Sequence, residues 1–318
     1  MTSDLAVPGD ASPGESGPGD RLVVVVVAYG SVDALASCLG ALGGGYPVVV
    51  VDNGSSVGAR RVAEGFGASY DDPGANLGFA AAVNRAIGGL DLAGTDVLLL
   101  NPDAVVEPEV VEVLRRELVE QPRVAAVAPS QRAPGSTVAD RVLWPFPSPW
   151  GLWLEAVGLG RLRTGRRSGF VVGSVLLLRG RALVDVGGFD ERFFLYDEET
   201  DWQRRAVSRG WEVAFCASAE ALHQGGGTDH DTRRRDLRFH AGTERYLRKW
   251  YGAVGWEVGR AAVVAGATFR SVVLRGDARR AALRRAGTYL AGPDRLARRR
   301  GAVPRAVPHV PVVSRGQA

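Results

Sequence analysis

The densest group of ionisable side chains lies in GGFDERFFLYDEETDWQRRA, residues 187–206. If a helix begins near Glu198, then Glu198, Asp201 and Arg205 share one of its faces. Acidic residues in a first helical turn also interact favourably with the helix dipole, so a purely structural explanation exists. A solvated helix start does not usually need the preceding Phe-Phe-Leu-Tyr, which favours a chemical role. The acidic members are Asp190, Glu191, Asp197, Glu198, Glu199 and Asp201.

A further carboxylate, Asp103, follows the apolar run of residues 98–100 in LLLNPDAVV. This run is typical of a strand that is buried on both faces. A carboxylate two steps beyond it must find water, a cation or a hydrogen-bond partner. Asp103 is therefore either a cap or a ligand.

The elements that would position these residues alternate between strand and helix. Residues 22–27, 48–52 and 95–100 are predicted strands, separated by helical stretches within 31–42, near 58–66 and within 76–90, the last entered through a Gly-marked loop. This order favours an α/β fold with a mostly parallel sheet and right-handed crossovers. Ligands bind such sheets at the carboxyl ends of the strands.

All three predicted strands end in polar residues, which a parallel sheet would bring to one edge. Any α/β domain can also cap its strands in this way, so both explanations stay open. The endings are Tyr29-Gly30-Ser31, Asp52-Asn53-Gly54 and Asn101-Pro102-Asp103.

The rest of the chain is predicted to contain a helix over 107–121, strands at 124–128 and near 170–178, and helices over 232–251 and 254–290. Residues 129–169 are rich in Pro, Trp and Arg and are expected to form a long irregular segment, such as a lid or a binding wall. Residues 1–20 are rich in Pro, Gly and Ser and are expected to be disordered.

The composition excludes several classes of protein. The first strand-to-helix turn, AYGSVDAL, lacks the G-x-G-x-x-G of a dinucleotide fold, and there is no Walker A motif. The two cysteines, Cys38 and Cys216, predict neither a disulfide framework nor a thiolate metal site. No segment has the roughly 20 uncharged apolar residues of a membrane-spanning helix. Arginine supplies every basic side chain except that of Lys249.

The charge is distributed unevenly. Residues 231–318 contain 20 Lys+Arg and 6 Asp+Glu, whereas residues 1–230 contain 19 and 29. A basic tail of this kind suits nucleic acid, anionic lipid or solvent. We expect an α/β catalytic domain at 21–230, a basic helical extension at 231–302 and a flexible tail at 303–318.

The order of motifs from Val23 to Thr228 resembles the family 2 inverting glycosyltransferases of GT-A fold, in particular their bacterial rhamnosyltransferase-like branch. The motifs that carry the resemblance are VVVAYGS, VVVDNGS, NLGFAAAVN, LLLNPD, GGFDERFFLYDEETDWQRR and LHQGGGT.

The resemblance implies a nucleotide-sugar site with a divalent metal, Mn²⁺ or Mg²⁺. Asp103 and His223 would bind the metal, and Asn101 stands where the family usually has the first aspartate of its Asp-x-Asp motif. Asp52 would read the nucleotide base from the Asp52-Asn53 turn, beside Tyr29 and Ser31. The residues expected near ribose and diphosphate are Asn76, Gly78 and Asn84.

The implied reaction is a direct displacement at the anomeric carbon, with one carboxylate taking the proton of the acceptor hydroxyl. The position of the family's base aligns with Glu199, which is one methylene longer than the usual aspartate. Glu198 is the alternative base, and Asp201 would complete the catalytic group by bracing it.

The branch also implies dTDP-rhamnose as donor and a glycan or polyprenyl-diphosphate-linked acceptor. We expect a cytoplasmic protein whose basic helices hold it on the inner face of the cell membrane; packing of those helices on the catalytic domain is the alternative. The rival functions are nucleic-acid binding through the basic tail, a nucleotidyltransferase, and a degenerate transferase that acts as a scaffold. No nucleic-acid partner is expected, because no reading motif is present.

Overall fold

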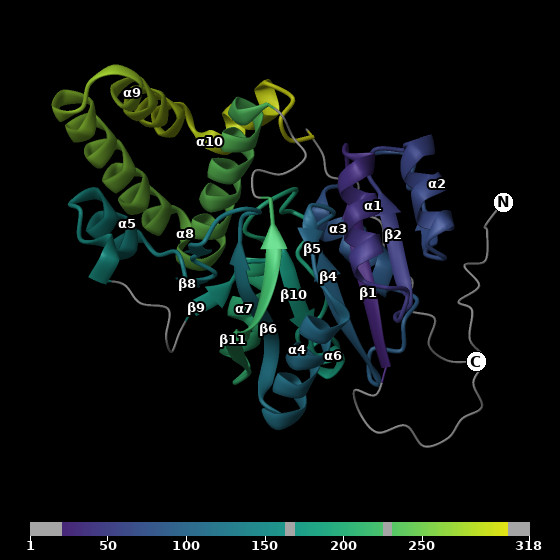
Figure 1. The fold of residues 1–318 in the computed structure, drawn as a ribbon. Helices are drawn as coiled ribbons and strands as arrows, with labels where there is room; N and C mark the ends of the chain where they lie inside the picture. Colours follow the sequence, from purple (N-terminus) through teal and green to yellow (C-terminus); the bar gives the residue numbers. More distant parts are fainter. Residues whose placement is uncertain (1–20, 163–168, 225–230, 305–318) are drawn as a thin grey trace, which may run out of the picture.

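A mixed, mostly parallel sheet organises the catalytic part of the molecule (Figure 1). The computed structural model describes residues 21–162, 169–224 and 231–304. The strand order is β3-β2-β1-β4-β10-β6-β11-β5, with β7 paired to β6. The strands are β1 (Arg21–Ala28), β2 (Val48–Asp52), β3 (Ser69–Asp71), β4 (Thr95–Leu100), β5 (Ala104–Val105), β6 (Val124–Arg132), β7 (Ala139–Asp140), β10 (Val175–Leu178) and β11 (Glu212–His223).

The strands that were predicted from the first hundred residues are parallel to one another. β1 pairs in parallel with β2 and β4, and β2 with β3. β10 runs antiparallel to both β4 and β6, while β11 is parallel to β6. The predicted α/β class with a mostly parallel sheet is therefore confirmed.

Alternate side chains of β1 enter different cores, because successive residues of a strand point to opposite faces. Val24 and Val26 pack in one core and Val23 and Val25 in the other. Helices α1 (Val32–Ala41), α2 (Val57–Gly65) and α4 (Pro108–Glu120) cover the first face. Helices α3 (Phe79–Ile87), α6 (Gly180–Val186) and α7 (Glu198–Ser208) cover the second.

Residues 129–169 are more ordered than expected. β6 continues to Arg132, and the segment then contains β7, β8 (Leu143–Pro145), α5 (Pro149–Ala156) and the short 3₁₀ helix Gly160–Leu162. β8 pairs with β9 (Gly169–Val171), because FVVGSVLLL divides near Gly173 into β9 and β10. Residues 163–168 lie outside the described part.

The C-terminal helices are α8 (Thr232–Val273), α9 (Gly276–Ala291) and α10 (Pro293–Arg299). α8 bends at Gly252, whose φ of 67° and ψ of −169° are not helical. Its first half packs on the acidic segment: Phe194 shares a buried cluster with Leu237 of α8 and Ala297 of α10. Phe194 of the Phe-Phe-Leu-Tyr sequence is therefore apolar because it packs against these helices.

The second half of α8 packs with α5 and α9, at the opposite end of the molecule from α2 (Figure 1). None of the described helices is long and apolar enough to cross a bilayer. The predicted disordered residues 1–20 lie outside the described part. So does most of the predicted tail, although Val303 at its start is buried beside α10.

Candidate active site

Asp103 lies in the tight turn between β4 and β5. All six residues of β4 are buried, so the strand is fixed up to Leu100. The Asn101 amide then donates to the Ser174 carbonyl (2.9 Å), and the Ala104 amide donates back to the Asn101 carbonyl (3.0 Å). These bonds hold Asp103 at the strand end with only 8% of its surface exposed.

His223 meets Asp103 because β11 pairs with β5, with His223 opposite Ala104. Asp103 Oδ1 lies 3.3 Å from His223 Nε2. This is ion-pair distance, but the geometry does not make a hydrogen bond: Nε2 is buried and lacks a hydrogen-bond partner among the described residues. A carboxylate facing an unpaired imidazole nitrogen is a suitable pair of ligands for a divalent cation.

The chain supplies few further ligands nearby. Within the described residues, no group of three His, Cys, Asp or Glu side chains could hold a metal ion. Cys38 is close, since its Sγ–H points at the Asn101 carbonyl (3.7 Å). However, burial and then the Asp103 charge raise the pKa of this thiol to about 12, so it stays protonated. A metal here would need ligand atoms from a substrate, such as phosphate oxygens.

The acidic segment enters α7 through two residues in the left-handed region. Tyr196 and Asp197 have φ of 72° and 68°, an unusual conformation for residues other than glycine. Burial, followed by the neighbouring Glu199 carboxylate, raises the pKa of Asp197 to about 8. The same two causes raise the pKa of Glu198 well above its ordinary value. The carboxyl groups of Asp197, Glu198 and Glu199 are therefore close together at the start of α7.

Glu199 is the member of this group that packs against Gly173, just before β10. Its side chain lies against Gly173, where an added Cβ would stand 3.1 Å from Glu199 Cγ. Ser174, the next residue, binds Asn101 two positions before Asp103. Glu198 is more enclosed, at 4% exposure, whereas Glu199 is only partly buried. This difference favours Glu199 as the carboxylate that contacts a substrate.

Two opposing effects act on the pKa of the Glu199 carboxyl. Burial raises the pKa of its carboxyl, while the backbone amides of Glu199, Thr200 and Gly173 act to lower it. Its Oε2 atom is buried and has no hydrogen-bond partner within the part of the chain described. An oriented carboxylate with an unused oxygen and a raised pKa has the properties of a general base.

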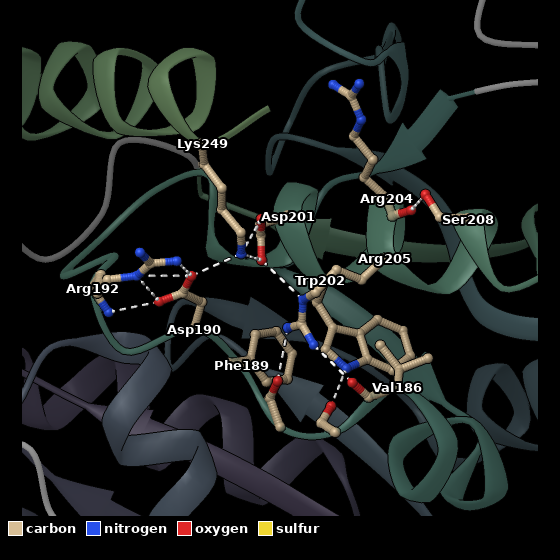
Figure 2. A network of polar contacts seen from close by, with 12 residues as sticks. Val186, Phe189, Asp190, Arg192, Asp201, Trp202, Arg204, Arg205, Ser208 and Lys249 are labelled. Atoms are coloured by element: carbon tan, nitrogen blue, oxygen red, sulfur yellow. Dashed lines mark hydrogen bonds and ion pairs between the residues drawn. The ribbon is translucent and has the colours of Figure 1, made fainter. Parts of the chain in front are cut away.

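Asp201 lies where it can brace the catalytic group, which is the role expected of it. It is 0% exposed. Its oxygens accept from Arg205 Nε (3.0 Å), Lys249 Nζ (2.7 Å) and Trp250 Nε1 (2.9 Å). Figure 2 shows Arg205 and Lys249 converging on it. Asp201 therefore braces α7 and cannot itself touch a substrate.

The predicted base-reading residues sit side by side at the ends of β1 and β2. Asp52 is buried and accepts from the Gly54 amide (2.8 Å), the Ser56 amide (2.7 Å) and the Tyr70 hydroxyl (2.7 Å). Ser31 caps α1 by accepting from the Ala34 amide (3.2 Å). Tyr29 (36% exposure) and Ser31 are exposed, whereas Asp52 is buried.

The loop before α3 is fastened to these strand ends. Asn53 Nδ2 donates to the Gly78 carbonyl (3.1 Å), and Asn53 Oδ1 accepts from the Leu77 amide (3.2 Å). Asn76 Oδ1 accepts from the Gly78 amide (2.9 Å). Gly78 has φ of 85°, and a Cβ there would lie 2.4 Å from the Phe194 carbonyl oxygen. Only glycine fits, so this loop and the acidic segment are held together.

Asn84 is a buried residue of α3 whose amide is hydrogen-bonded within the protein. Its Nδ2 donates to the Phe189 carbonyl (2.8 Å) and to Glu191 Oε1 (2.9 Å), and its Oδ1 accepts from the Phe189 amide (2.8 Å). The amide is used up in joining α3 to the acidic segment. Its role near ribose and diphosphate stays a prediction; the packing of the acidic segment on this face of α3 is what helical spacing alone does not show.

Comparison with known proteins decides the family. Residues 18–253 match the model described as glycosyltransferase like family 2. The chain belongs to this family. It is 32% identical over 244 residues to the N-acetylglucosaminyl-diphospho-decaprenol L-rhamnosyltransferase of Mycobacterium tuberculosis, covering 66% of this chain and 78% of that protein. It is 26% identical over 212 residues to the low-salt glycan biosynthesis hexosyltransferase Agl10 of Haloferax volcanii, covering 64% and 67%.

Solved structures confirm the GT-A fold. The glucosyl-3-phosphoglycerate synthase of Mycobacterium tuberculosis, in complex with Mn²⁺, UDP and glucosyl-3-phosphoglycerate, has a TM-score of 0.52 to this chain at 15% identity, covering 72% of this chain and 79% of its own. The predicted fold is thus confirmed, and the family match confirms the predicted enzyme class, a glycosyltransferase. At this identity the likeness establishes the fold alone.

Sequence reasoning missed Gly173, Ser174 and Gln131, which connect the two halves of the site. Ser174 Oγ donates to Gln131 Oε1 at 2.5 Å, and Gln131 Nε2 is left buried without a partner among the described residues. Their only signal was the glycine that interrupts FVVGSVLLL.

Proposed function

We propose that this family 2 glycosyltransferase moves a sugar, rhamnose in the first instance, from a nucleoside-diphosphate donor to a hydroxyl of a lipid-linked glycan. The observation that carries the proposal is the meeting of Asp103 and His223, two residues 120 positions apart, with His223 Nε2 buried and without a hydrogen-bond partner among the described residues. The rhamnosyltransferase relative supports the sugar and the decaprenol-linked acceptor by its name. dTDP-rhamnose is the donor that we would test first.

Glu199 would remove the proton from the acceptor hydroxyl. The acceptor oxygen then forms a bond to the anomeric carbon, while the bond from that carbon to the diphosphate oxygen breaks and the diphosphate leaves with the electron pair. The leaving group needs no proton, so one base suffices. Asp103 and His223 would hold a divalent ion, which supplies positive charge for the diphosphate.

A panel of nucleotide sugars tests this proposal. Thermal shift with Mn²⁺ should show stabilisation by dTDP-rhamnose or another single donor, and radiolabelled transfer to a polyprenyl-diphosphate-linked acceptor should follow. Binding without any transfer or hydrolysis would favour a degenerate scaffold. Salt-dependent DNA binding without donor binding would favour the nucleic-acid rival.

We also propose that the far helices rest on an anionic membrane. The solvent-facing side of the second half of α8 carries large apolar side chains, with Val254, Phe269 and Val272 exposed at 78%, 65% and 80%; Glu257 is the acidic residue exposed on it. Residues 253–302 contain 11 arginines against Glu257, Asp277 and Asp294. Apolar side chains beside arginines fit the interface of an anionic bilayer, where a lipid-linked acceptor would reside.

Vesicle flotation tests this attachment. The double variant Phe269→Ser/Val272→Ser should lose most binding to anionic vesicles, whereas the matched control Val57→Ser/Val119→Ser, exposed at 73% and 75% on α2 and α4, should keep it. Equal flotation of both variants would contradict the proposal. A concentration-dependent dimer that only the first variant abolishes would assign this side of α8 to a second copy instead.

A further inference from the structure

Lys249 is the only lysine in the chain, and it occupies a position that the mechanism above does not use. It lies near the end of the first half of α8. Its Nζ contacts Asp190 Oδ2 at 2.7 Å and the Asp201 carboxylate at 2.7 Å. Figure 2 shows the lysine reaching down from α8 between these two aspartates.

The two carboxylates come from separate parts of the acidic segment. Asp190 precedes the left-handed turn, and Asp201 follows it in the first turns of α7. Burial alone would raise the pKa of Asp190, but hydrogen bonds from Arg192 and Lys249 hold it below its usual value, so the group is ionised. One ammonium group therefore links both sides of the turn.

Each of the two aspartates that Lys249 contacts also binds an arginine. Arg192 binds both oxygens of Asp190, and Arg205 joins Asp201 to the carbonyls of Val186 (3.0 Å) and Gly188 (2.7 Å). These bonds tie the acidic segment to itself. Two cations tie it to α8: Arg204 donates to the hydroxyls of Tyr246 and Tyr251 (both 3.0 Å), and Lys249 contacts the two aspartates.

The same face of α8 presses on the turn itself. A Cβ at Gly242 would lie 2.7 Å from the Tyr196 carbonyl oxygen, so α8 approaches as closely as a glycine allows. Thr243 Oγ1 donates to Asp197 Oδ2 at 3.3 Å. Gly242 and Lys249 are seven residues apart, which places them on one helix face. α8 thus contacts the left-handed residues at one point and the two aspartates at another.

We propose that Lys249 is a positioning residue for the transfer reaction: through Asp190 and Asp201 it fixes the start of α7, and so the orientation of Glu199. This inference rests on the proposed function. Lysine suits the task because a tetrahedral ammonium can donate to carboxylates from different directions, whereas the guanidinium of arginine is a planar fork. A displacement of a catalytic group by about 1 Å can cost about 100-fold in rate.

The test compares steady-state kinetics of three variants with wild type. Lys249→Met should lower kcat about 30-fold and leave the KM for the donor within about twofold, because the donor site is untouched. Lys249→Arg keeps the charge but not its geometry, and its kcat should fall between the two. Arg248→Met is the matched control: this neighbour pairs with Glu244 within α8 (2.8 Å) and should keep wild-type kcat.

Each outcome has a definite meaning. A kcat for Lys249→Met within twofold of wild type, or equal to that of Arg248→Met, would overturn the positioning role. If Lys249→Met does not fold, Asp190→Asn carries the test: kcat should fall about tenfold, and unchanged turnover would overturn the role. Failure of the proposed function looks different, because wild type itself would then transfer no sugar.

Discussion

The strand ends that face the predicted nucleotide and the region around α7 use their polar groups differently. Asp52, Asn53 and Asn84 have their side-chain oxygens and amides occupied by neighbouring backbone or side chains. Around Asp103 and α7, by contrast, buried polar atoms lack partners in the described part of the chain: Glu191 Oε2, Glu198 Oε2, Glu199 Oε2, His223 Nε2 and Gln131 Nε2.

This difference separates residues that build the site from residues that are available to act. A buried polar atom without a partner costs free energy, so it persists where a ligand completes it or where function requires it. Saturated residues should therefore affect stability when they are changed, and unsaturated residues should affect chemistry. Four substitutions can break or sharpen this distinction.

The largest expected effect is that of Glu199→Gln. Transfer should fall about 1,000-fold, because glutamine cannot accept the proton, while donor binding measured by calorimetry stays within about twofold. Glu220→Gln, at an exposed position on β11, serves as the control. Turnover retained in Glu199→Gln would move the base to Glu198.

The next effect is that of His223→Ala. Loss of one of two proposed protein contacts should lower activity roughly 100-fold at limiting Mn²⁺, with partial recovery in excess metal. A metal titration of initial rates measures this. If the rate at limiting metal is unchanged, His223 does not bind the ion, and its orphaned nitrogen needs another explanation.

Asn84→Ala should act on stability instead. Removing an amide that makes three hydrogen bonds leaves buried partners unsatisfied and should lower the free energy of unfolding by about 2 kcal/mol. The kcat per folded molecule should be nearly unchanged, as urea unfolding and active-site titration would show. A loss of donor affinity without a loss of stability would restore the ribose role.

The smallest effect is the pH dependence of Asp197. Its pKa is raised to about 8 by burial and by Glu199, so the folded state keeps a proton that the unfolded state loses near pH 4. Stability from this group is present at low pH and is lost as pH rises toward about 8. Asp197→Asn keeps the left-handed geometry and should stabilise the protein by at least about 1 kcal/mol at pH 8.5, because each pKa unit corresponds to about 1.4 kcal/mol. The gain in urea unfolding should be much smaller at pH 5; an equal gain at both would contradict the assignment.

The sequence predicts the sheet well because its signals are local. Continuous apolar runs ending in polar turns identify β1, β2 and β4, and the parallel pairing follows from the helices between them. The order of motifs also identifies the family and brings Asp103 and His223 into one hypothesis. The structure places these two residues in contact.

The sequence predicts the supports of the site poorly because they depend on distant packing. Nothing local shows that Asn84 faces Phe189 or that Asp201 is enclosed by Trp250 and Lys249. The sequence also predicts too much irregular structure in residues 129–169. Helix α5 forms there because it packs on glycines of α8 that are about a hundred residues away: Gly255, Gly259 and Gly266 approach Pro149, Leu152 and Ala156. In the sequence, the only indication of such a close approach is a glycine within a helix.

Anomalous diffraction from crystals soaked with Mn²⁺ and a nucleoside diphosphate tests the central claim most directly. The account predicts one manganese peak within ligand distance of an Asp103 carboxylate oxygen and His223 Nε2, with the diphosphate completing its coordination and Glu199 on the same pocket. A peak elsewhere, or a diphosphate bound away from the β4–β5 turn, would contradict the account.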